Sequence, residues 1–168
     1  MYDACIKLEN SKTEKPSPSQ KLIEPKKSEE ILLSQDFKID GSDFTSAGSV
    51  STEIKSILKK IGFDPKLIRR IAISTYEAEM NVVMHADNAT VTLSVTPQYI
   101  QVIFEDYGKG IPDVEKALQE GFTTATDEMR AMGFGSGMGL PNIKRNSDEL
   151  EIESEVGKGT KLQIKFLI

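Results

Sequence analysis

The sequence predicts a single α/β domain in which one sheet carries helices on one face. The chain has 168 residues, of which 38% are hydrophobic, and this supports one core but scarcely two. Two segments with apolar residues at helical spacing are followed by pairs of segments in which apolar and polar residues alternate. Glycine and proline mark the turns between these segments. Strands and helices therefore belong to one compact unit.

The first 30 residues differ in composition from the rest. They are rich in Lys, Glu, Ser and Pro and show no apolar periodicity. Segments of this kind cannot bury enough apolar surface to fold. We therefore predict a flexible extension over residues 1–30 and a folded domain over 31–168, beginning with an edge strand at 31–40.

Two helices are expected next. Ser42 or Asp43 can cap the first, which should end at Gly62. The pair Asp64 and Pro65 is typical of the start of a second helix, which should reach about residue 86. The remaining elements, in order, are predicted to be a hairpin of strands at 88–95 and 99–106, a short helix at 114–119, a glycine-containing loop at 120–138, a helix at 140–147 and a hairpin of strands at 149–154 and 160–168.

Composition and charge exclude several classes of function. The net charge of −5 leaves no basic surplus to neutralise a phosphate backbone, so no direct nucleic-acid contact is expected. No stretch approaches the roughly twenty apolar residues that cross a bilayer, and the N-terminus lacks a signal peptide's apolar core. Cys5 is the only cysteine, as is usual in a reducing cytoplasm. A cytoplasmic protein with a protein or small-molecule partner is expected.

The predicted second helix carries a polar stripe. Glu77 and Asn81 are four residues apart and share one side of the helix, and His85 follows one turn later. An amide oxygen can help to hold Mg²⁺, and a carboxylate can take a proton from a hydroxyl nucleophile. Taken alone, the same spacing is also typical of a solvated helix face.

The second motif is Asp106-Tyr107-Gly108-Lys109-Gly110. Asp106 is in phase with the buried side of its strand, where a carboxylate needs a partner such as the amino group of a ligand. The two glycines permit a sharp turn and a close approach of the backbone to a flat ring. An ordinary turn uses the same residue types.

The third motif places glycine at every second position from Gly133 to Gly139, directly before a predicted helix. Backbone N–H groups there can bind an anion, and the helix N-terminus adds partial positive charge. A flexible linker is the alternative. Neither the dinucleotide pattern nor the P-loop pattern is present. Thr160 is in phase with the buried residues of the last strand, so its hydroxyl should face the same layer as Asp106.

Four motifs occur in a distinctive order: Glu77-x-x-x-Asn81, Asp106-x-Gly108-x-Gly110, Gly137-Met138-Gly139-Leu140 and Gly157-x-Gly159-Thr160. In this order they resemble the ATPase superfamily of gyrase, histidine kinases and MutL, abbreviated GHKL. Within it, the stretch 137–160 is similar to the small anti-sigma-type serine/threonine kinases of bacteria, in particular the stressosome-linked switch kinases. The resemblance covers the chain from about Asp36 to the C-terminus.

The resemblance implies the Bergerat ATP-binding fold, a two-layer sandwich of helices on a mixed, mostly antiparallel sheet, with ATP between the layers. It implies Glu77 as general base, Asn81 as the ligand of Mg²⁺ and residues 121–139 as a lid over the phosphates. Asp106 is implied to bind the adenine amino group. The full set of implied nucleotide-binding residues is Asn81, Asp106, Gly108, Gly110, Ile111, Gly135, Gly137, Met138, Gly139, Leu140 and Thr160.

The resemblance further implies a regulatory protein kinase that phosphorylates a serine or threonine of a STAS-type antagonist protein. The added phosphate carries roughly two negative charges and would separate the partners. The alternative is a non-catalytic module in which ATP only orders the lid and the ordered surface captures a sigma factor or another regulator. ATP or ADP is the expected nucleotide in either case. A detached sensor histidine kinase domain is disfavoured, because no helix with a phosphoacceptor histidine precedes the domain. The oligomeric state stays open, a homodimer included.

Overall fold

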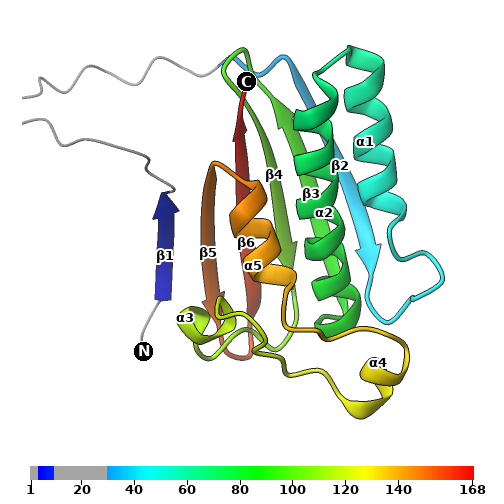
Figure 1. Cartoon of the computed structure of the whole chain (residues 1–168), viewed down its shortest axis with the longest axis vertical. Coiled ribbons are helices and arrows are strands. Elements are labelled where there is room, and N and C mark those ends of the chain that lie inside the picture. Colours follow the sequence, from blue (N-terminus) through cyan, green and yellow to red (C-terminus); the bar gives the residue numbers. More distant parts are fainter. Residues whose placement is uncertain (1–3, 10–29) are drawn as a thin grey trace, which may run out of the picture.

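The computed structural model describes residues 4–9 and 30–168 of the chain, which form a sheet with helices packed against it (Figure 1). The strands are β1 (Ala4–Glu9), β2 (Leu33–Asp40), β3 (Asn88–Val95), β4 (Tyr99–Asp106), β5 (Glu149–Glu155) and β6 (Gly159–Leu167). The helices are α1 (Ser49–Ile61), α2 (Pro65–His85), α3 (Val114–Ala117), α4 (Asp127–Ala131) and α5 (Gly139–Asn146).

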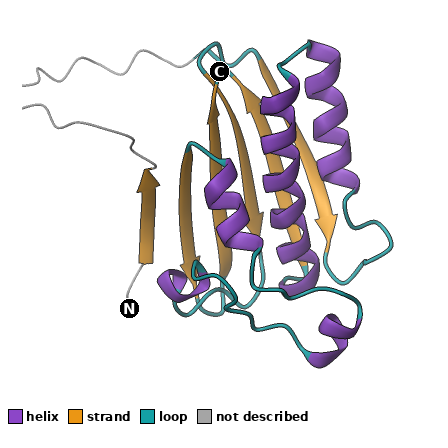
Figure 2. Ribbon diagram, viewed as in Figure 1, coloured by secondary structure: helices purple, strands orange, loops and turns teal. Residues whose placement is uncertain are grey.

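The described strands form one six-stranded sheet in the order β1-β5-β6-β4-β3-β2. Helices α1, α2 and α5 all lie on the same face of it (Figure 2). The predicted two-layer fold is thereby confirmed, and β2 is an edge strand as expected. Every pairing among these strands is antiparallel, so this sheet is not mixed.

The core lies between the sheet and the helices. The central strands bury every second side chain, which is the pattern expected of a sheet with one covered face. Helix α2 packs against α1 on one side and α5 on the other. The largest apolar side chains that are almost wholly buried are Phe166, Ile54, Leu58, Ile71, Leu93, Ile100, Ile143, Leu150, Ile152 and Ile164. Each contributes roughly 1.5–3 kcal/mol through burial.

Helix α1 begins later than predicted. It starts at Ser49, whereas Ser42 or Asp43 was the expected cap. The Asp43 carboxylate instead accepts hydrogen bonds from the backbone N–H groups of Thr45 and Ser46, in a turn that precedes the helix. An Asp side chain can satisfy a turn as readily as a helix N-terminus, so the residue type did not distinguish the two. The predicted end at Gly62 is confirmed.

The N-terminus of α1 is capped from α2. The Glu79 side chain, only 1% exposed, accepts hydrogen bonds from the backbone N–H groups of Gly48 at 3.0 Å, Val50 at 3.1 Å and Ser51 at 2.8 Å. A carboxylate is favourable there because the helix N-terminus carries partial positive charge. A buried acid thus joins the two helices, and the sequence analysis missed it because the contact spans about thirty residues of chain.

Helix α2 begins as predicted. The Asp64 side chain accepts hydrogen bonds from the N–H groups of Lys66 at 2.9 Å and Leu67 at 3.3 Å, and Pro65 occupies the first helical position. The helix ends at His85. Both observations agree with the sequence analysis to within one residue.

The long loop after α3 contains a short helix that was not predicted. The Thr126 hydroxyl accepts a hydrogen bond from the N–H of Met129 and caps α4. Figure 1 shows α4 at the outer end of this loop, beyond the end of α2. Since α4 has only five residues and buries none of them, it has no apolar pattern to detect.

The predicted extension over residues 1–30 falls mostly outside the described part of the chain. Within it, β1 pairs antiparallel with β5, with Ala4 opposite Ser154 and Glu9 opposite Glu149. A strand therefore stands at the sheet edge where none was predicted. Pairing with a sheet edge uses backbone groups, which the side-chain pattern of a short segment does not reveal.

Candidate nucleotide site

The polar stripe of α2 meets the start of α5. Glu77 and Asn81 are both half-buried. A Cβ atom built on Gly139 would lie 3.4 Å from the Asn81 Oδ1 atom and 3.5 Å from the Glu77 Oε2 atom. The carboxylate, the amide and the first residue of α5 therefore adjoin one another, as the sequence analysis expected of one site.

Asn142 holds the Glu77 carboxylate. Its Nδ2 atom donates a hydrogen bond of 2.8 Å to Glu77 Oε1. Asn142 lies in the first turn of α5, and its own backbone N–H donates to the Met138 carbonyl. Asn142 was not among the predicted site residues. Its position in the first turn after the glycine run could have indicated a role at the site, because that turn faces α2.

The start of α5 leaves backbone donors available. Met138 occupies the N-cap position and provides no side-chain hydrogen bond to the helix. The backbone N–H groups of Gly139 and Leu140 are therefore not capped by a side chain, and Gly139 adjoins Glu77 and Asn81. Such a helix start suits an anion.

Asp106 lies at the end of β4, paired across the sheet with Thr160 of β6. Its Oδ1 atom accepts hydrogen bonds from the backbone N–H groups of Gly108 at 2.9 Å and Thr160 at 3.2 Å. Burial raises the pKa of Asp106, and these two hydrogen bonds partly oppose the rise. Among the described residues, no group donates to Oδ2, so this oxygen can accept a further hydrogen bond.

Ser154 belongs to the same cluster, although the sequence analysis did not name it as a site residue. Its hydroxyl oxygen accepts a hydrogen bond from the backbone N–H of Ile111 at 2.8 Å and lies 2.8 Å from the Thr160 hydroxyl. Ile111, one of the predicted nucleotide-binding residues, thus belongs to this cluster through its backbone N–H. Ser154 is in phase with the buried residues Leu150 and Ile152, which was the signal that could have found it.

The glycines after Asp106 are required by close backbone contacts. A Cβ on Gly108 would lie 2.7 Å from the His85 carbonyl oxygen, and one on Gly110 would lie 2.2 Å from the Glu155 carbonyl oxygen. Gly110 also has a φ of 73°, which side chains rarely adopt. The contact of Gly108 with His85 places Asp106 at the same end of the molecule as Asn81, one turn earlier in α2.

The glycine run before α5 shapes the loop. A Cβ on Gly135 would lie 2.2 Å from the Ala125 Cβ, and one on Gly137 would lie 2.4 Å from the backbone carbon of Gly121. The Gly121 N–H also donates to the Gly137 carbonyl at 3.0 Å. Gly135 and Gly137 therefore lie against the loop itself, while Gly139 alone of this run lies against Glu77 and Asn81.

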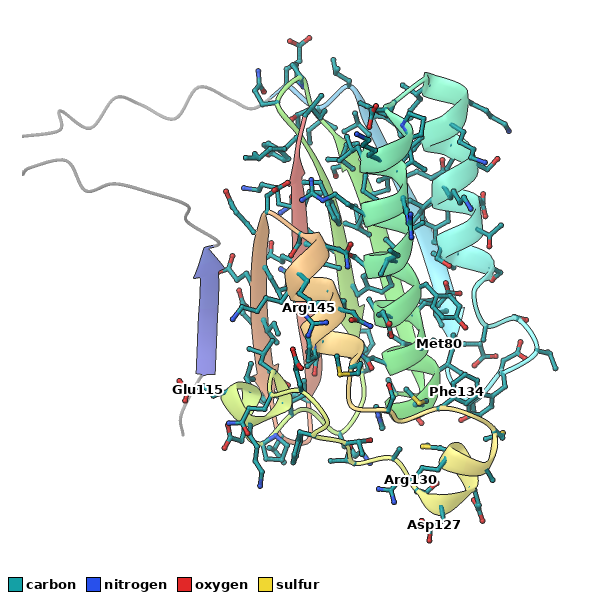
Figure 3. The ribbon with its side chains drawn as sticks, in the orientation of Figure 1. Met80, Glu115, Asp127, Arg130, Phe134 and Arg145 are labelled. Carbon is teal, nitrogen blue, oxygen red and sulfur yellow. The ribbon has the colours of Figure 1, made fainter. Side chains whose placement is uncertain are left out.

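Charged residues flank the loop. Arg145 of α5 forms an ion pair with Glu120 at the base of the loop. Figure 3 shows Arg130 and Asp127 at the outer end, away from α5, and these two side chains pair at 3.5 Å. Phe134 lies at the lower end of α2 in the same view and stacks against Phe44, with ring centroids 5.6 Å apart. The loop is thus held at its base and on the side nearest α1.

His85 is the last residue of α2. Burial lowers the pKa of His85, and the positive charge of Lys109 lowers it further. Its Nδ1 atom is buried without a hydrogen-bond partner. An uncharged imidazole is therefore favoured beside Gly108.

The match to known proteins covers most of the chain. Residues 42–166 match the model of the histidine kinase-like ATPase domain. The chain belongs to this family. Its four motifs gather around one end of α2, and the prediction of the superfamily is confirmed.

Relatives of this ATPase domain include two kinds of bacterial regulator. The serine/threonine-protein kinase RsbT of Bacillus subtilis is 31% identical over 118 residues, which are 67% of this chain and 83% of that protein. The anti-sigma F factor of Caldanaerobacter subterraneus is 40% identical over 104 residues, 58% of this chain and 69% of that protein. The domain is thus similar to a protein kinase and to a factor that acts against a sigma factor.

The fold of this ATPase domain also occurs in the solved SiaB–SiaC complex of Pseudomonas aeruginosa. The similarity has a TM-score of 0.51 at 13% identity and covers 82% of this chain and 89% of that one. At this identity it supports the fold alone. Within the part of the chain that the structure describes, no helix is both long and apolar enough to cross a membrane.

Proposed function

We propose that this ATPase domain is a regulatory protein kinase that transfers the γ-phosphate of ATP to a serine or threonine of a partner protein. The observation that carries the proposal is the position of Glu77. Its carboxylate is fixed by Asn142 and adjoins Asn81 and the start of α5. A fixed carboxylate beside an anion-binding helix start suits proton removal from a hydroxyl. A module that only binds ATP has no need of such a base.

The nucleotide would lie across the end of the sheet and the start of α5. Asp106 would accept a hydrogen bond from the adenine amino group through Oδ2, which has no donor among the described residues. Gly110, Ile111 and Thr160 would complete the adenine site, and the N–H groups of Gly139 and Leu140 would face the phosphates. The loop 121–139 would cover them as a lid.

Mg²⁺ would depend on few protein ligands. Among the described residues, no group of three or more His, Cys, Asp and Glu side chains could hold a metal ion. Mg²⁺ is commonly held by one or two side chains together with phosphate oxygens and water. The amide oxygen of Asn81 fits that role, and the ion would supply charge neutralisation of the phosphates.

The transfer forms a bond between the partner's hydroxyl oxygen and the γ-phosphorus and breaks the bond from that phosphorus to the bridging oxygen, so that ADP leaves. Glu77 takes the hydroxyl proton. The backbone donors at the start of α5 stabilise the charge on the phosphoryl oxygens. Positioning and charge stabilisation supply most of the catalysis in this class of reaction.

A groove between α1 and α2 leads to Glu77. It has a volume of about 850 Å³ and is lined by Ser51, Thr52, Lys55, Lys59, Phe63, Pro65, Ile68, Arg69, Ala72, Ile73, Tyr76 and Glu77. Its apolar lining residues and three basic side chains suit a protein surface with acidic residues.

We assign the partner as a STAS-type antagonist protein and the location as the cytoplasm.

Phosphate transfer tests the proposal. The protein is mixed with a STAS-type antagonist from the same genome and radiolabelled ATP, and we expect label on the antagonist. Glu77→Gln should lower the rate roughly 100- to 10,000-fold while the affinity for ATP changes less than about twofold. Glu105→Gln is the matched control, since Glu105 is exposed on the other face of β4. Transfer at the normal rate by Glu77→Gln would remove Glu77 from its role.

The similarity to an anti-sigma factor favours a second function, capture of a sigma factor without transfer. In that case ATP would only order the lid. Stable, ATP-dependent binding of a sigma factor by both the unaltered protein and Glu77→Gln, with no label transferred to any antagonist, would favour this function over the kinase.

A further inference from the structure

The two oxygen atoms of the Glu77 carboxylate have different surroundings. Oε1 accepts a hydrogen bond of 2.8 Å from the Asn142 side chain. Oε2 lies beside the start of α5, 3.5 Å from a Cβ atom built on Gly139. Among the described residues, no group donates a hydrogen bond to Oε2. One oxygen is therefore occupied, and the other is available to a hydroxyl group at the start of α5.

The amide of Asn142 has to turn its nitrogen toward Glu77. A carboxylate oxygen only accepts hydrogen bonds, and of the two polar atoms of an Asn side chain only Nδ2 donates. A hydrogen bond to a charged acceptor is roughly twice as strong as one between neutral groups. In the part of the chain that the structure describes, the Asn81 side chain makes no such contact with Glu77. Asn142 is thus the donor that fixes the rotation of the carboxylate.

Asn142 has a defined position in the first turn of α5. Its backbone N–H donates to the carbonyl of Met138, the N-cap residue, at 2.8 Å. Gly139 and Leu140 stand in the same turn, and their backbone N–H groups are the donors proposed for the phosphates. The side chain that orients Glu77 and the backbone that would hold the phosphates are thus parts of one helical turn.

The geometry of this turn matters for transfer. Phosphoryl transfer depends mainly on the positions of the hydroxyl, the base and the phosphate relative to one another. A displacement of about 1 Å between reacting groups can lower a rate roughly 100-fold. A link between Glu77 and the turn that would hold the phosphates removes one source of such displacement, because α2 and α5 then carry the base and the phosphates in a fixed relation. The hydrogen bond from Asn142 to Glu77 is that link.

We propose that Asn142 is a positioning residue that holds Oε1 of Glu77, turns Oε2 toward the target hydroxyl and ties this orientation to the helical turn that binds the phosphates. The inference rests on the proposed function. In the transfer step, Oε2 takes the hydroxyl proton while the hydroxyl oxygen bonds to the γ-phosphorus and the bond from that phosphorus to the bridging oxygen of ADP breaks. Asn142 touches neither ATP nor the hydroxyl and acts through Glu77.

Separate measurements of kcat and of the affinity for ATP test this assignment. Asn142→Ala removes the donor, and kcat for label transfer to the antagonist should fall roughly 10- to 100-fold, as expected when a hydrogen bond to a charged group is lost. The affinity for ATP, measured by calorimetry, should change less than about twofold, because the backbone donors of Gly139 and Leu140 remain. Asn142→Leu has nearly the shape of the original side chain without the donor, leaves a smaller cavity than alanine, and should give the same result.

Combination with Glu77→Gln separates positioning from a purely structural role. Since Asn142 acts through the base, Asn142→Ala should lower the remaining rate of Glu77→Gln less than about twofold further, whereas a structural residue would lower both backgrounds by the same factor. Asn146→Ala is the matched control. It removes the same side chain one turn later on α5, where the amide donates to a backbone carbonyl and not to Glu77, and kcat should stay within about twofold of the unaltered protein.

The outcomes separate this inference from the function on which it rests. A normal kcat in Asn142→Ala, or an equal fall in both backgrounds, would overturn the inference and leave the kinase and its base in place. A loss of ATP affinity as large as the loss of kcat would show a structural residue and overturn it likewise. Absence of transfer by the unaltered protein, or normal transfer by Glu77→Gln, would overturn the proposed function and the inference together.

Discussion

Burial acts in opposite directions on two titratable side chains at the site. It raises the pKa of Asp106 and lowers the pKa of His85, since each neutral form is favoured away from water. Burial thus makes the charged form of Asp106, which would bind adenine, unfavourable in the protein without nucleotide. Substitution and titration of Asp106 and His85 measure these effects separately.

Asp106→Asn should separate binding from stability. The affinity for ATP should fall roughly 10- to 100-fold, as expected when a hydrogen bond to a charged group is lost. Without nucleotide, the melting temperature at neutral pH should be equal to or above that of the unaltered protein, because the variant buries no charge. Calorimetric titration and thermal melting measure the two effects.

The pH dependence of stability checks the same residue. The native pKa of Asp106 lies above 3.8, so the native state holds a proton to higher pH than the unfolded chain does. Its contribution to stability is therefore present below 3.8 and is lost as the pH rises through the native pKa. Asp106→Asn should lack this loss, and a variant that keeps it would assign the pH dependence to another group.

His85 offers a direct titration, because it is the only histidine of the chain. Its single imidazole resonance should titrate below pH 6.5, the ordinary value. Lys109→Ala should move the pKa upward but not as far as 6.5, since burial is the larger cause and is unchanged. Nuclear magnetic resonance at several pH values measures both.

The stability linked to His85 has the opposite sign to that of Asp106. The unfolded chain takes up the proton first as the pH falls, so stability is fully present above 6.5 and is lost as the pH falls through the native pKa. Lys116→Ala is a suitable control, since it removes a comparable charge that is not among the causes of the His85 shift. An unchanged His85 pKa in Lys109→Ala would contradict the assignment.

At this scale, spacing and strand phase indicate candidate site residues. Glu77, Asn81, Asp106 and Thr160 were found in that way. Ser154 was not named, although strand phase places it on the same face. Its importance depends on the pairing of β5 with β6 and on a bond to the loop after β4, and both contacts join distant parts of the chain.

At the scale of elements, the junction of α1 and α2 depends on one buried acid. Glu79→Ala should lower the free energy of unfolding by about 2–4 kcal/mol, because three backbone N–H groups at the start of α1 lose their acceptor in a buried place. Urea denaturation measures the loss. Glu53→Ala on the exposed side of α1 should change stability by less than about 0.5 kcal/mol.

Glu79→Gln refines this test. The amide keeps one acceptor oxygen and the shape of the side chain, so the loss should be smaller than for alanine. Equal stability of Glu79→Ala and the unaltered protein would show that α1 does not depend on this acceptor.

The elements themselves were largely predictable, and their starts were less so. The strands β3 and β4 follow strict alternation, and Asp64 with Pro65 marks the start of α2. The start of α1 was placed too early because its acceptor comes from another helix. Helix α4 was missed because it buries no residue, and β1 because its six residues are held by an edge of the sheet.

At the scale of the whole molecule, the groove between α1 and α2 predicts a charge-dependent partner contact. Lys55→Glu should weaken binding of the antagonist roughly 10-fold, and the difference should shrink at high salt, because exposed charges are screened. The affinity for ATP should be unchanged. Lys38→Glu makes the same change on the exposed face of β2 and should affect neither. Equal antagonist binding by both variants would place the contact elsewhere.

The two-layer fold could be predicted from sequence, and so could the gathering of the motifs at one end of α2, because they lie on strands and helices whose ends meet. The groove could not, since it depends on how closely α1 lies to α2. That spacing is set by packing and by the contact of Glu79 with α1, neither of which a local pattern contains.

Glu77 and Glu79 are two residues apart and so point to different sides of α2. One carboxylate adjoins α5, where the chemistry is proposed, and the other holds α1, which borders the groove. Helix α2 therefore connects the proposed base directly to the helix that borders the groove.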